Sequence, residues 1–86
     1  MPIVSTFFGI IIRMFFGDHN PPHFHVEHQG EKAAFDLNGN IIAGELSSRT
    51  AKDLVRNWAK RHRLELMINW KLQAQGKALN RIEPLD

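Results

Sequence analysis

Histidine is concentrated in one short stretch of this 86-residue chain, around a pair of prolines. Four of the five histidines fall between Asp18 and His28. Imidazole changes its charge near neutral pH and also binds transition metals, so such a stretch favours acid–base chemistry or metal coordination. Asp18 and His19 stand before the prolines, and His23 and His25 follow them. These four residues are the first candidates for a functional site.

The first hypothesis is a metal site. The alternation that begins at His23 predicts a strand on which His23, His25 and Glu27 share one face. Two histidines spaced in this way chelate Zn²⁺, Ni²⁺ or Fe²⁺ when a further ligand is present. Asp18 or His19, in the stiff turn before the strand, would supply that ligand and leave a position open for water. The predicted metal ligands are His23, His25, His19 and Asp18.

The second hypothesis is metal-free acid–base chemistry on a phosphodiester such as RNA. His23 and His25 would act as acid and base, and Asp18 would orient an imidazole through its ring N–H. Arg13 or Lys32 would stabilise the charge that develops on the phosphate. The candidate catalytic residues are His23, His25, Asp18, His19 and Arg13.

The third interpretation is structural. Asp and Asn beside prolines set turns through hydrogen bonds from side chain to backbone, and histidines on half-buried strands often bond only to the backbone. His28, on the opposite face of the predicted strand, and His62, on an apolar helical stripe, fit this interpretation best. At the level of sequence all three interpretations stay open.

Length and composition limit the class of protein. Residues 1–86 are enough for a single domain with one small core. The chain has no cysteine, which excludes disulfides and thiolate metal sites. Polar residues interrupt the apolar N-terminal run, so we expect no membrane segment and a cytoplasmic location. The net charge of +2 is too small to indicate a nucleic-acid partner by itself.

The first part of the chain, about residues 3–46, predicts a meander of antiparallel strands. Its segments are rich in β-branched and aromatic residues, and Asn38-Gly39-Asn40 is the strongest hairpin signal between them. Arg13 lies between apolar neighbours, where it would either extend to solvent or reach a carboxylate beside the histidine strand. The expected strands are 3–8, 10–16, one that begins at His23, 32–37 and 41–46.

The second part predicts helices over about residues 48–75. Apolar residues recur every three or four positions after a pair of serines that would cap the first helix. A phase change near residues 61–63 predicts two helices, although one long kinked helix would also fit, and Gly76 would end the helical part. Residues 79–85 would form either a short tail or a short edge strand. Trp58 and Trp70 are expected to fill the core.

These elements predict an α+β domain: a small antiparallel sheet of four or five strands covered on one face by two C-terminal helices. A basic stripe follows the polar side of the expected helices. It would contact RNA phosphates or an acidic protein partner, or it would simply be a solvated surface. No aromatic residue interleaves with it to stack on bases. The stripe consists of Lys52, Arg56, Lys60 and Arg63.

The sequence resembles a small prokaryotic family, domain of unknown function 4160. The resemblance extends over essentially the whole chain, and it is most specific in the block Asp-His-Asn-Pro-Pro-His-Phe-His at residues 18–25. Further segments that carry the resemblance are 9–16, 58–63, 69–70 and 82–85.

Some members of that family are classed as DhiT-type toxins of type II toxin–antitoxin pairs, and members commonly occur beside a small protein of family 2442. The resemblance therefore implies a toxin, with an antitoxin from the neighbouring gene as its partner. The clustering of histidines, and not the resemblance, places the expected site of such a toxin in the histidine-rich stretch. It carries over no established catalytic residue, and it leaves open whether the protein is an enzyme. The alternatives are a non-enzymatic module that binds nucleic acid or protein, and a small metal-binding protein.

Overall fold

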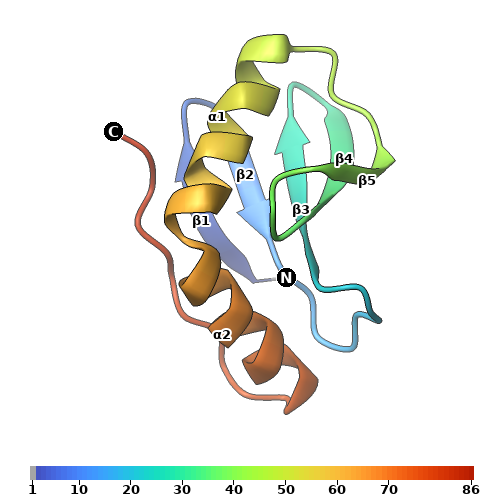
Figure 1. Cartoon of the computed structure of the whole chain (residues 1–86), viewed down its shortest axis with the longest axis vertical. Helices are drawn as coiled ribbons and strands as arrows, with labels where there is room; N and C mark the ends of the chain where they lie inside the picture. The colour runs from blue at the N-terminus through green and yellow to red at the C-terminus, as the bar shows by residue number, and fades with distance from the viewer. Residues whose placement is uncertain (1) are drawn as a thin grey trace.

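Five short strands and then two helices follow one another along the chain, as the sequence predicts (Figure 1). The computed structural model describes residues 2–86. The strands are Ile3–Phe7 (β1), Ile10–Arg13 (β2), His23–His28 (β3), Glu31–Asp36 (β4) and Ile41–Gly44 (β5). The helices are Arg49–Arg61 (α1) and Arg63–Ala74 (α2).

The strands form one antiparallel sheet in which each strand pairs with the next along the chain. Tight turns make this order possible. Phe8 and Gly9 both have positive φ, 50° and 77°, as a two-residue hairpin between β1 and β2 requires. In the turn between β4 and β5, the Asp36 carboxylate accepts hydrogen bonds from the backbone N–H groups of Asn38 and Asn40. The predicted meander is confirmed.

Two strands are shorter than the sequence predicts. β2 ends at Arg13. The N–H of Met14 still donates to the carbonyl oxygen of Pro2 at 3.2 Å, and residues 15–16 then leave the sheet towards a turn at Gly17, where φ is 79°. β5 ends at Gly44, whose φ of 73° lies outside the range that an extended strand can adopt. The apolar residues 14–16 made the predicted second strand too long, and Leu46, two residues after β5, had the same effect on the fifth.

α1 covers one face of the sheet, and α2 continues from it past the ends of the strands (Figure 1). The core lies between the helical layer and the sheet. Trp58 of α1 is fully buried, and its ring lies 5.6 Å from the ring centroids of both Phe7 and Phe24. Phe24 in turn stacks on Phe35 at 5.7 Å. Trp58 therefore fills the core as the sequence predicts. Trp70 does not, because it is only half-buried at the margin of the core.

The helices meet at His62, inside the predicted break. The φ and ψ of His62, −116° and 25°, depart from helical values and separate α1 from α2. Ser48 caps α1 by accepting a hydrogen bond from the N–H of Ala51 at 3.0 Å. Gly76, with φ of 68°, ends the helical part just after α2. No helix within residues 2–86 combines the length and the apolar character that crossing a bilayer requires.

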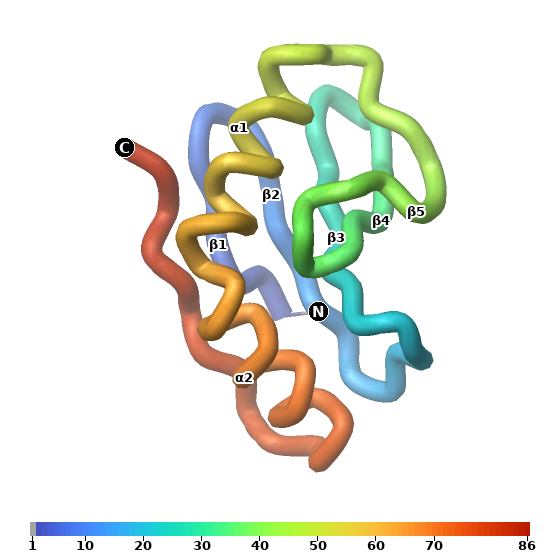
Figure 2. Tube along the Cα trace, viewed as in Figure 1, coloured from blue at the N-terminus to red at the C-terminus, as the bar shows by residue number. Residues whose placement is uncertain are grey.

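The C-terminal tail forms no strand over residues 79–85, so of the two forms expected from the sequence it takes that of a tail without regular structure. It still runs beside β1 (Figure 2), because the backbone N–H of Ile82 donates to the carbonyl oxygen of Val4 at 2.7 Å. The indole N–H of Trp58 donates to the carbonyl oxygen of Glu83 at 2.9 Å. The tail therefore covers the outer edge of β1 and is tied to α1.

Candidate functional site

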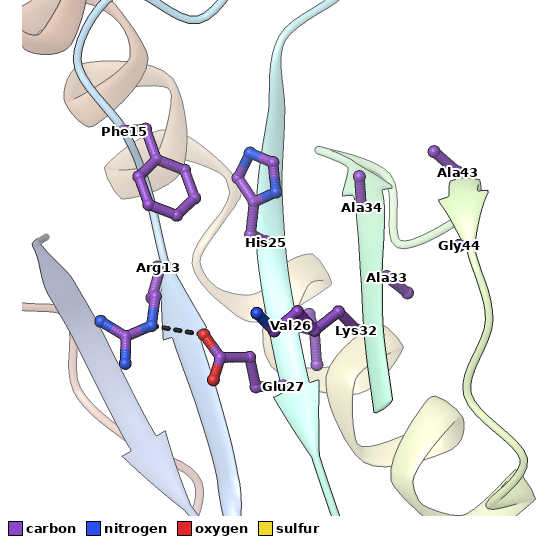
Figure 3. A pocket seen from close by; sticks show the side chains of 10 residues that line it. All are labelled: Arg13, Phe15, His25, Val26, Glu27, Lys32, Ala33, Ala34, Ala43 and Gly44. Atoms are coloured by element: carbon purple, nitrogen blue, oxygen red, sulfur yellow. Dashed lines mark hydrogen bonds and ion pairs between the residues drawn. The ribbon is translucent and has the colours of Figure 1, made fainter. Parts of the chain in front are cut away.

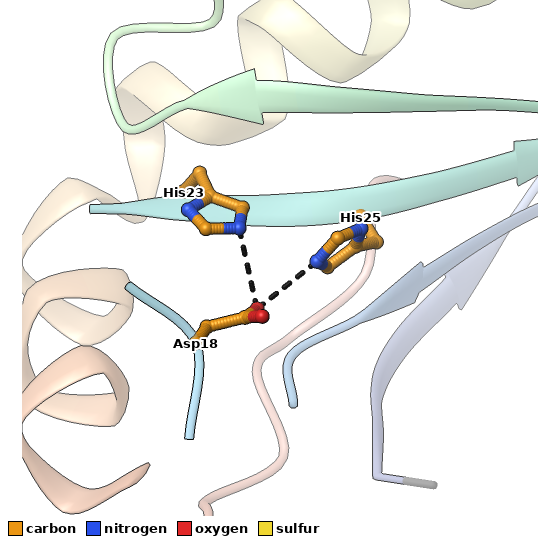
Figure 4. A group of neighbouring side chains, drawn as sticks. All are labelled: Asp18, His23 and His25. Atoms are coloured by element: carbon orange, nitrogen blue, oxygen red, sulfur yellow. Dashed lines mark hydrogen bonds and ion pairs between the residues drawn. The ribbon is translucent and has the colours of Figure 1, made fainter. Parts of the chain in front are cut away.

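Strand β3 divides its side chains between the core and the face of the sheet that points away from α1. Phe24 and Val26 are fully buried in the core, as the alternation predicts. His23 and His25 lie on the other face and are half-buried. The turn after β2 folds back and places Asp18 beside the two histidines (Figure 4).

Three metal-ligand atoms converge at this point. Asp18 Oδ2 lies 3.0 Å from His25 Nε2 and 3.2 Å from His23 Nε2. One ligand atom from each of the three residues lies within 4.8 Å of the other two. The side chains are between 12% and 31% exposed, so they are partly shielded from water but can be reached from solvent. Asp18, His23 and His25 are named the 2-His-1-Asp cluster below.

The ring of His23 is held by a second polar contact. Its Nδ1 lies 2.7 Å from the carbonyl oxygen of Pro21. A carbonyl oxygen only accepts hydrogen bonds, so Nδ1 carries a proton and donates it. In a neutral imidazole, Nε2 then presents a lone pair to the cluster. Histidines that bind metals in proteins show the same arrangement, in which the second ring nitrogen donates to a backbone carbonyl.

Two aromatic rings pack against the imidazoles, and sequence reasoning assigned neither of them to the site. Phe15 meets the ring of His25 edge-on, with centroids 4.5 Å apart. Trp70 lies 5.3 Å from the ring of His23, so its position beside the cluster replaces the expected position in the core. The alternation of side chains along a strand places Phe15 on the same face as Arg13, so the sequence contained this signal. No sequence signal relates Trp70 to the histidine strand.

Several predicted candidates lie outside the cluster. His19 is exposed and does not join the three ligand residues. Arg13 pairs instead with Glu27, with 2.5 Å between Nε and Oε2, which is the carboxylate contact that the sequence allowed. His28 ends β3, and His62 lies at the junction of the helices. The structure thus brings three of the predicted residues together and places Arg13 beside them, as the cross-strand partner of His25.

An open groove of about 500 Å³ begins at His25 and continues across the same face of the sheet (Figure 3). Cross-strand pairing places Arg13, His25, Ala34 and Ala43 in one row across four strands. The two alanines give the groove a low apolar floor, and Phe15 stands at one side. His25 therefore belongs both to the cluster and to the groove.

Positive charge lies along this groove. Arg13 uses Nε to bind Glu27, and its two Nη groups have no hydrogen-bond partner within residues 2–86. Lys32, the cross-strand partner of Glu27, forms no ion pair within the described chain. The groove therefore has one carboxylate, that of Glu27, and two cationic side chains. Both cations keep hydrogen-bond donors that a ligand can use.

The basic stripe lies on a different side of the molecule. α1 packs on the sheet through its apolar side, so its polar side points away from the groove. Within the stripe, Arg56 contacts Asp53 at 3.9 Å and the carbonyl oxygen of Gly39 at 3.4 Å. The structure does not bring the stripe together with the cluster. Its residues are Lys52, Arg56, Lys60 and Arg63.

The fold and the site define a small α+β protein with a 2-His-1-Asp cluster beside an open groove on its sheet. The chain belongs to the family described as Domain of unknown function (DUF4160), which matches residues 9–71. The matched region begins just before β2, contains the whole cluster and reaches into α2. Comparison with curated proteins and with solved structures gives no match.

Proposed function

We propose that the protein binds a divalent metal ion through Asp18, His23 and His25, and that this ion is the centre of its activity. The observation that carries the proposal is the approach of two imidazole nitrogens to one carboxylate oxygen, at 3.0 and 3.2 Å. Four-coordinate Zn²⁺, with Zn–N distances of about 2.0–2.1 Å, holds its ligand atoms roughly 3.3 Å apart. The cluster therefore needs little rearrangement to hold such an ion.

The hydrogen bond between His23 and Pro21 supports this proposal. With Nδ1 protonated, a neutral His23 directs the Nε2 lone pair at a carboxylate oxygen 3.2 Å away. Two electron-rich atoms at that distance repel each other. A cation between them removes the repulsion and binds to both. A second proton on His23 would also remove it, and the metal-binding experiment below separates the two explanations.

The ligand set limits the identity of the ion. Imidazole nitrogens with one carboxylate suit Zn²⁺, Ni²⁺ or Fe²⁺, and three protein ligands leave positions open for water or an anionic group. When bound, such an ion acts as a Lewis acid on whatever occupies those positions. The carbonyl of Pro21 orients His23, and Phe15 and Trp70 limit the movement of the two rings.

A metal-free acid–base site is the second candidate, and the 3.0 Å hydrogen-bond contact between Asp18 and His25 favours it. In this case Asp18 orients the imidazole of His25, and His23 serves as the partner acid or base. Arg13 would then stabilise charge on a phosphodiester such as RNA. Activity of this kind survives removal of all metal by a chelator, whereas activity that depends on a bound ion does not.

Metal binding is tested by supplying purified protein with Zn²⁺, Ni²⁺ or Fe²⁺ and measuring bound metal per chain and affinity by titration calorimetry. We expect a single ion per chain in the wild type. Asp18→Asn and His25→Ala should each weaken binding at least about 100-fold. His19→Ala is the matched control, because His19 lies in the same turn but outside the cluster. Undiminished binding by His25→Ala would contradict the proposed site.

We further propose that the protein acts in the cytoplasm as the toxin of a type II toxin–antitoxin pair, with the neighbouring gene product as antitoxin. The classing of some members of the family as such toxins, together with the histidine cluster, supports this role. The test is controlled expression in the native host without the neighbouring gene, comparing the wild type with a folded His23→Ala/His25→Ala variant.

Growth arrest by the wild type alone, relieved by the partner, would support a toxin whose site is the cluster. Equal arrest by both proteins would move the active surface to the basic stripe. Normal growth with both would contradict the toxin role and favour a binding module.

A further inference from the structure

We infer that the groove beside the cluster binds a phosphate ester, whose phosphate group is held by the bound metal ion, Arg13 and Lys32. The inference rests on the proposed metal site and names the class of ligand that this site takes. The ester's organic group would lie on the apolar floor formed by Ala34 and Ala43. The phosphate would lie where the groove meets the cluster, at His25.

Charge is the first reason for an anionic ligand. A divalent ion bound by one carboxylate and two neutral imidazoles leaves one net positive charge at the cluster. Along the groove, Arg13 and Lys32 carry two positive charges, and Glu27 carries one negative charge. Site and groove together are therefore net positive, and a groove lined by one sign of charge attracts the opposite ion.

The number of unused donors is the second reason, and it favours phosphate over carboxylate. The ion has open positions, Arg13 has two Nη groups without a partner in residues 2–86, and Lys32 has a free ammonium group there. These are three separate cationic partners. A phosphate monoester offers three terminal oxygens, one for each partner, whereas a carboxylate offers two.

The shape of the groove is the third reason, and it favours an ester over the inorganic ion. The groove has a volume of about 500 Å³, far more than a phosphate ion fills. Small organic ligands occupy pockets of about 300–1,000 Å³ that combine apolar walls with a few polar groups. Here the alanine floor and the ring of Phe15 supply the apolar walls, and the cations stand along them.

The experiment uses the full-length protein with zinc held slightly below the protein concentration, so that no free ion binds the probe. Titration calorimetry compares phenyl phosphate with two simpler anions. Inorganic phosphate shares its phosphate group, and benzoate shares its aromatic ring but carries a carboxylate. We expect phenyl phosphate to bind at least about tenfold more tightly than either of the other two. Adenosine monophosphate is added to distinguish nucleotides from other phosphate esters as the source of this chemistry.

Two variants locate the ligand, each with a matched control. Ala43→Leu fills the floor and should weaken phenyl phosphate binding about tenfold, whereas Ala78→Leu, on the exposed tail, should not change it. Lys32→Met should weaken it about tenfold, and Lys60→Met, which removes a lysine from α1, should leave it unchanged. Zinc content is measured for every variant, and all four should keep the ion.

The outcomes separate this inference from the proposed metal site. A protein that takes up no metal overturns both. A protein that binds zinc but does not bind phenyl phosphate overturns only the assignment of the groove. Equal affinity for phenyl phosphate and inorganic phosphate, or an unchanged affinity in Ala43→Leu, also overturns it. Tight binding of benzoate would overturn the preference for phosphate.

Discussion

The side-chain amide of Asn69 forms two hydrogen bonds with the backbone of Asn80. Its Nδ2 donates to the carbonyl oxygen of Asn80 at 2.9 Å, and its Oδ1 accepts from the N–H of Asn80 at 2.9 Å. Asn69 is fully buried, so these bonds replace the water that both backbone groups would otherwise bind. They hold the tail against α2. Asn69 is followed in the chain by Trp70, whose ring packs against His23 of the cluster.

Replacing Asn69 by alanine should therefore destabilise the protein. Asn69→Ala removes both hydrogen bonds to the backbone of Asn80, and at about 1 kcal/mol for each bond this should lower the free energy of unfolding by about 2 kcal/mol. Chemical denaturation measures this value. Asn57→Ala, on the exposed side of α1, should change it by less than about 0.5 kcal/mol. Equal losses in the two variants would show that the paired hydrogen bonds contribute nothing specific.

Trp70 should report metal binding by its fluorescence. Its ring lies 5.3 Å from that of His23, so paramagnetic Ni²⁺ at the cluster should quench its emission. The chain has one other tryptophan, Trp58, buried in the core. Trp70→Phe should keep the ion, measured as nickel per chain, but lose most of the quenching. Quenching that persists in this variant would place the ion elsewhere.

The bound ion should also stabilise the fold. Because the ligands come from β3 and from the turn before it, an unfolded chain cannot present them together. At a free metal concentration of 100 times Kd, the free energy of unfolding should rise by about 2.7 kcal/mol. Asp18→Asn should show no such gain, and chemical denaturation of both proteins with and without the ion measures the difference.

Gly44 should tolerate substitution less well than Gly9, although both have positive φ. A Cβ on Gly44 would lie 2.4 Å from the carbonyl oxygen of Lys32, whereas a Cβ on Gly9 would meet no atom within 4 Å. Gly9→Ala should therefore incur only the left-handed backbone penalty, about 1 kcal/mol. Gly44→Ala should lose about 2 kcal/mol more, because the backbone must move. Thermal and chemical unfolding of the two variants would measure the difference.

Glu31 should make stability depend on acid pH. Its carboxylate accepts hydrogen bonds from the hydroxyl and the backbone N–H of Ser47, and these bonds, in that order, lower the pKa of Glu31. A lowered pKa in the folded state means stability that is present at pH 7 and lost as the pH falls below about 5. Glu31→Gln should therefore be less stable than the wild type at pH 7, and the difference should narrow at pH 3.

The matched control for this prediction is Glu83→Gln. The side chain of Glu83 forms no hydrogen bond or ion pair within residues 2–86, so its replacement should give a small, pH-independent change. Denaturation midpoints at pH 7 and pH 3 for the three proteins give the comparison. A constant difference between the wild type and Glu31→Gln would show that the bond to Ser47 does not favour the charged form.

Local sequence patterns were sufficient for most of the fold. The alternation after His23 reflects a strand with one face in the core, and the phase change near His62 reflects the end of one helical face and the start of another. The ends of the strands were harder to predict from sequence. Phe15 and Phe16 are residue types that favour strands, although the backbone leaves the sheet there. The sequence also left open whether the tail joins the sheet, because a tail held to β1 by one backbone hydrogen bond and a true edge strand have the same alternation of apolar residues.

The site could be predicted only in part from the sequence, because some of its residues are brought together by tertiary packing. Asp18, His23 and His25 lie within one short segment, so the turn and the strand alone bring them together. Trp70 comes from a helix that is distant in the chain, and only the packing of α2 beside β3 places it there. The groove likewise depends on the register of β4 and β5, which places Ala34 and Ala43 side by side.

The position of the C-terminal tail limits how copies of this protein can join. The tail occupies the outer edge of β1, and within residues 2–86 no strand pairs with the outer edge of β5. The sheet can therefore be extended from one end only. Two molecules that pair through β5 leave no open edge for a third, so edge-to-edge association stops at a closed twofold pair and cannot propagate into a fibre.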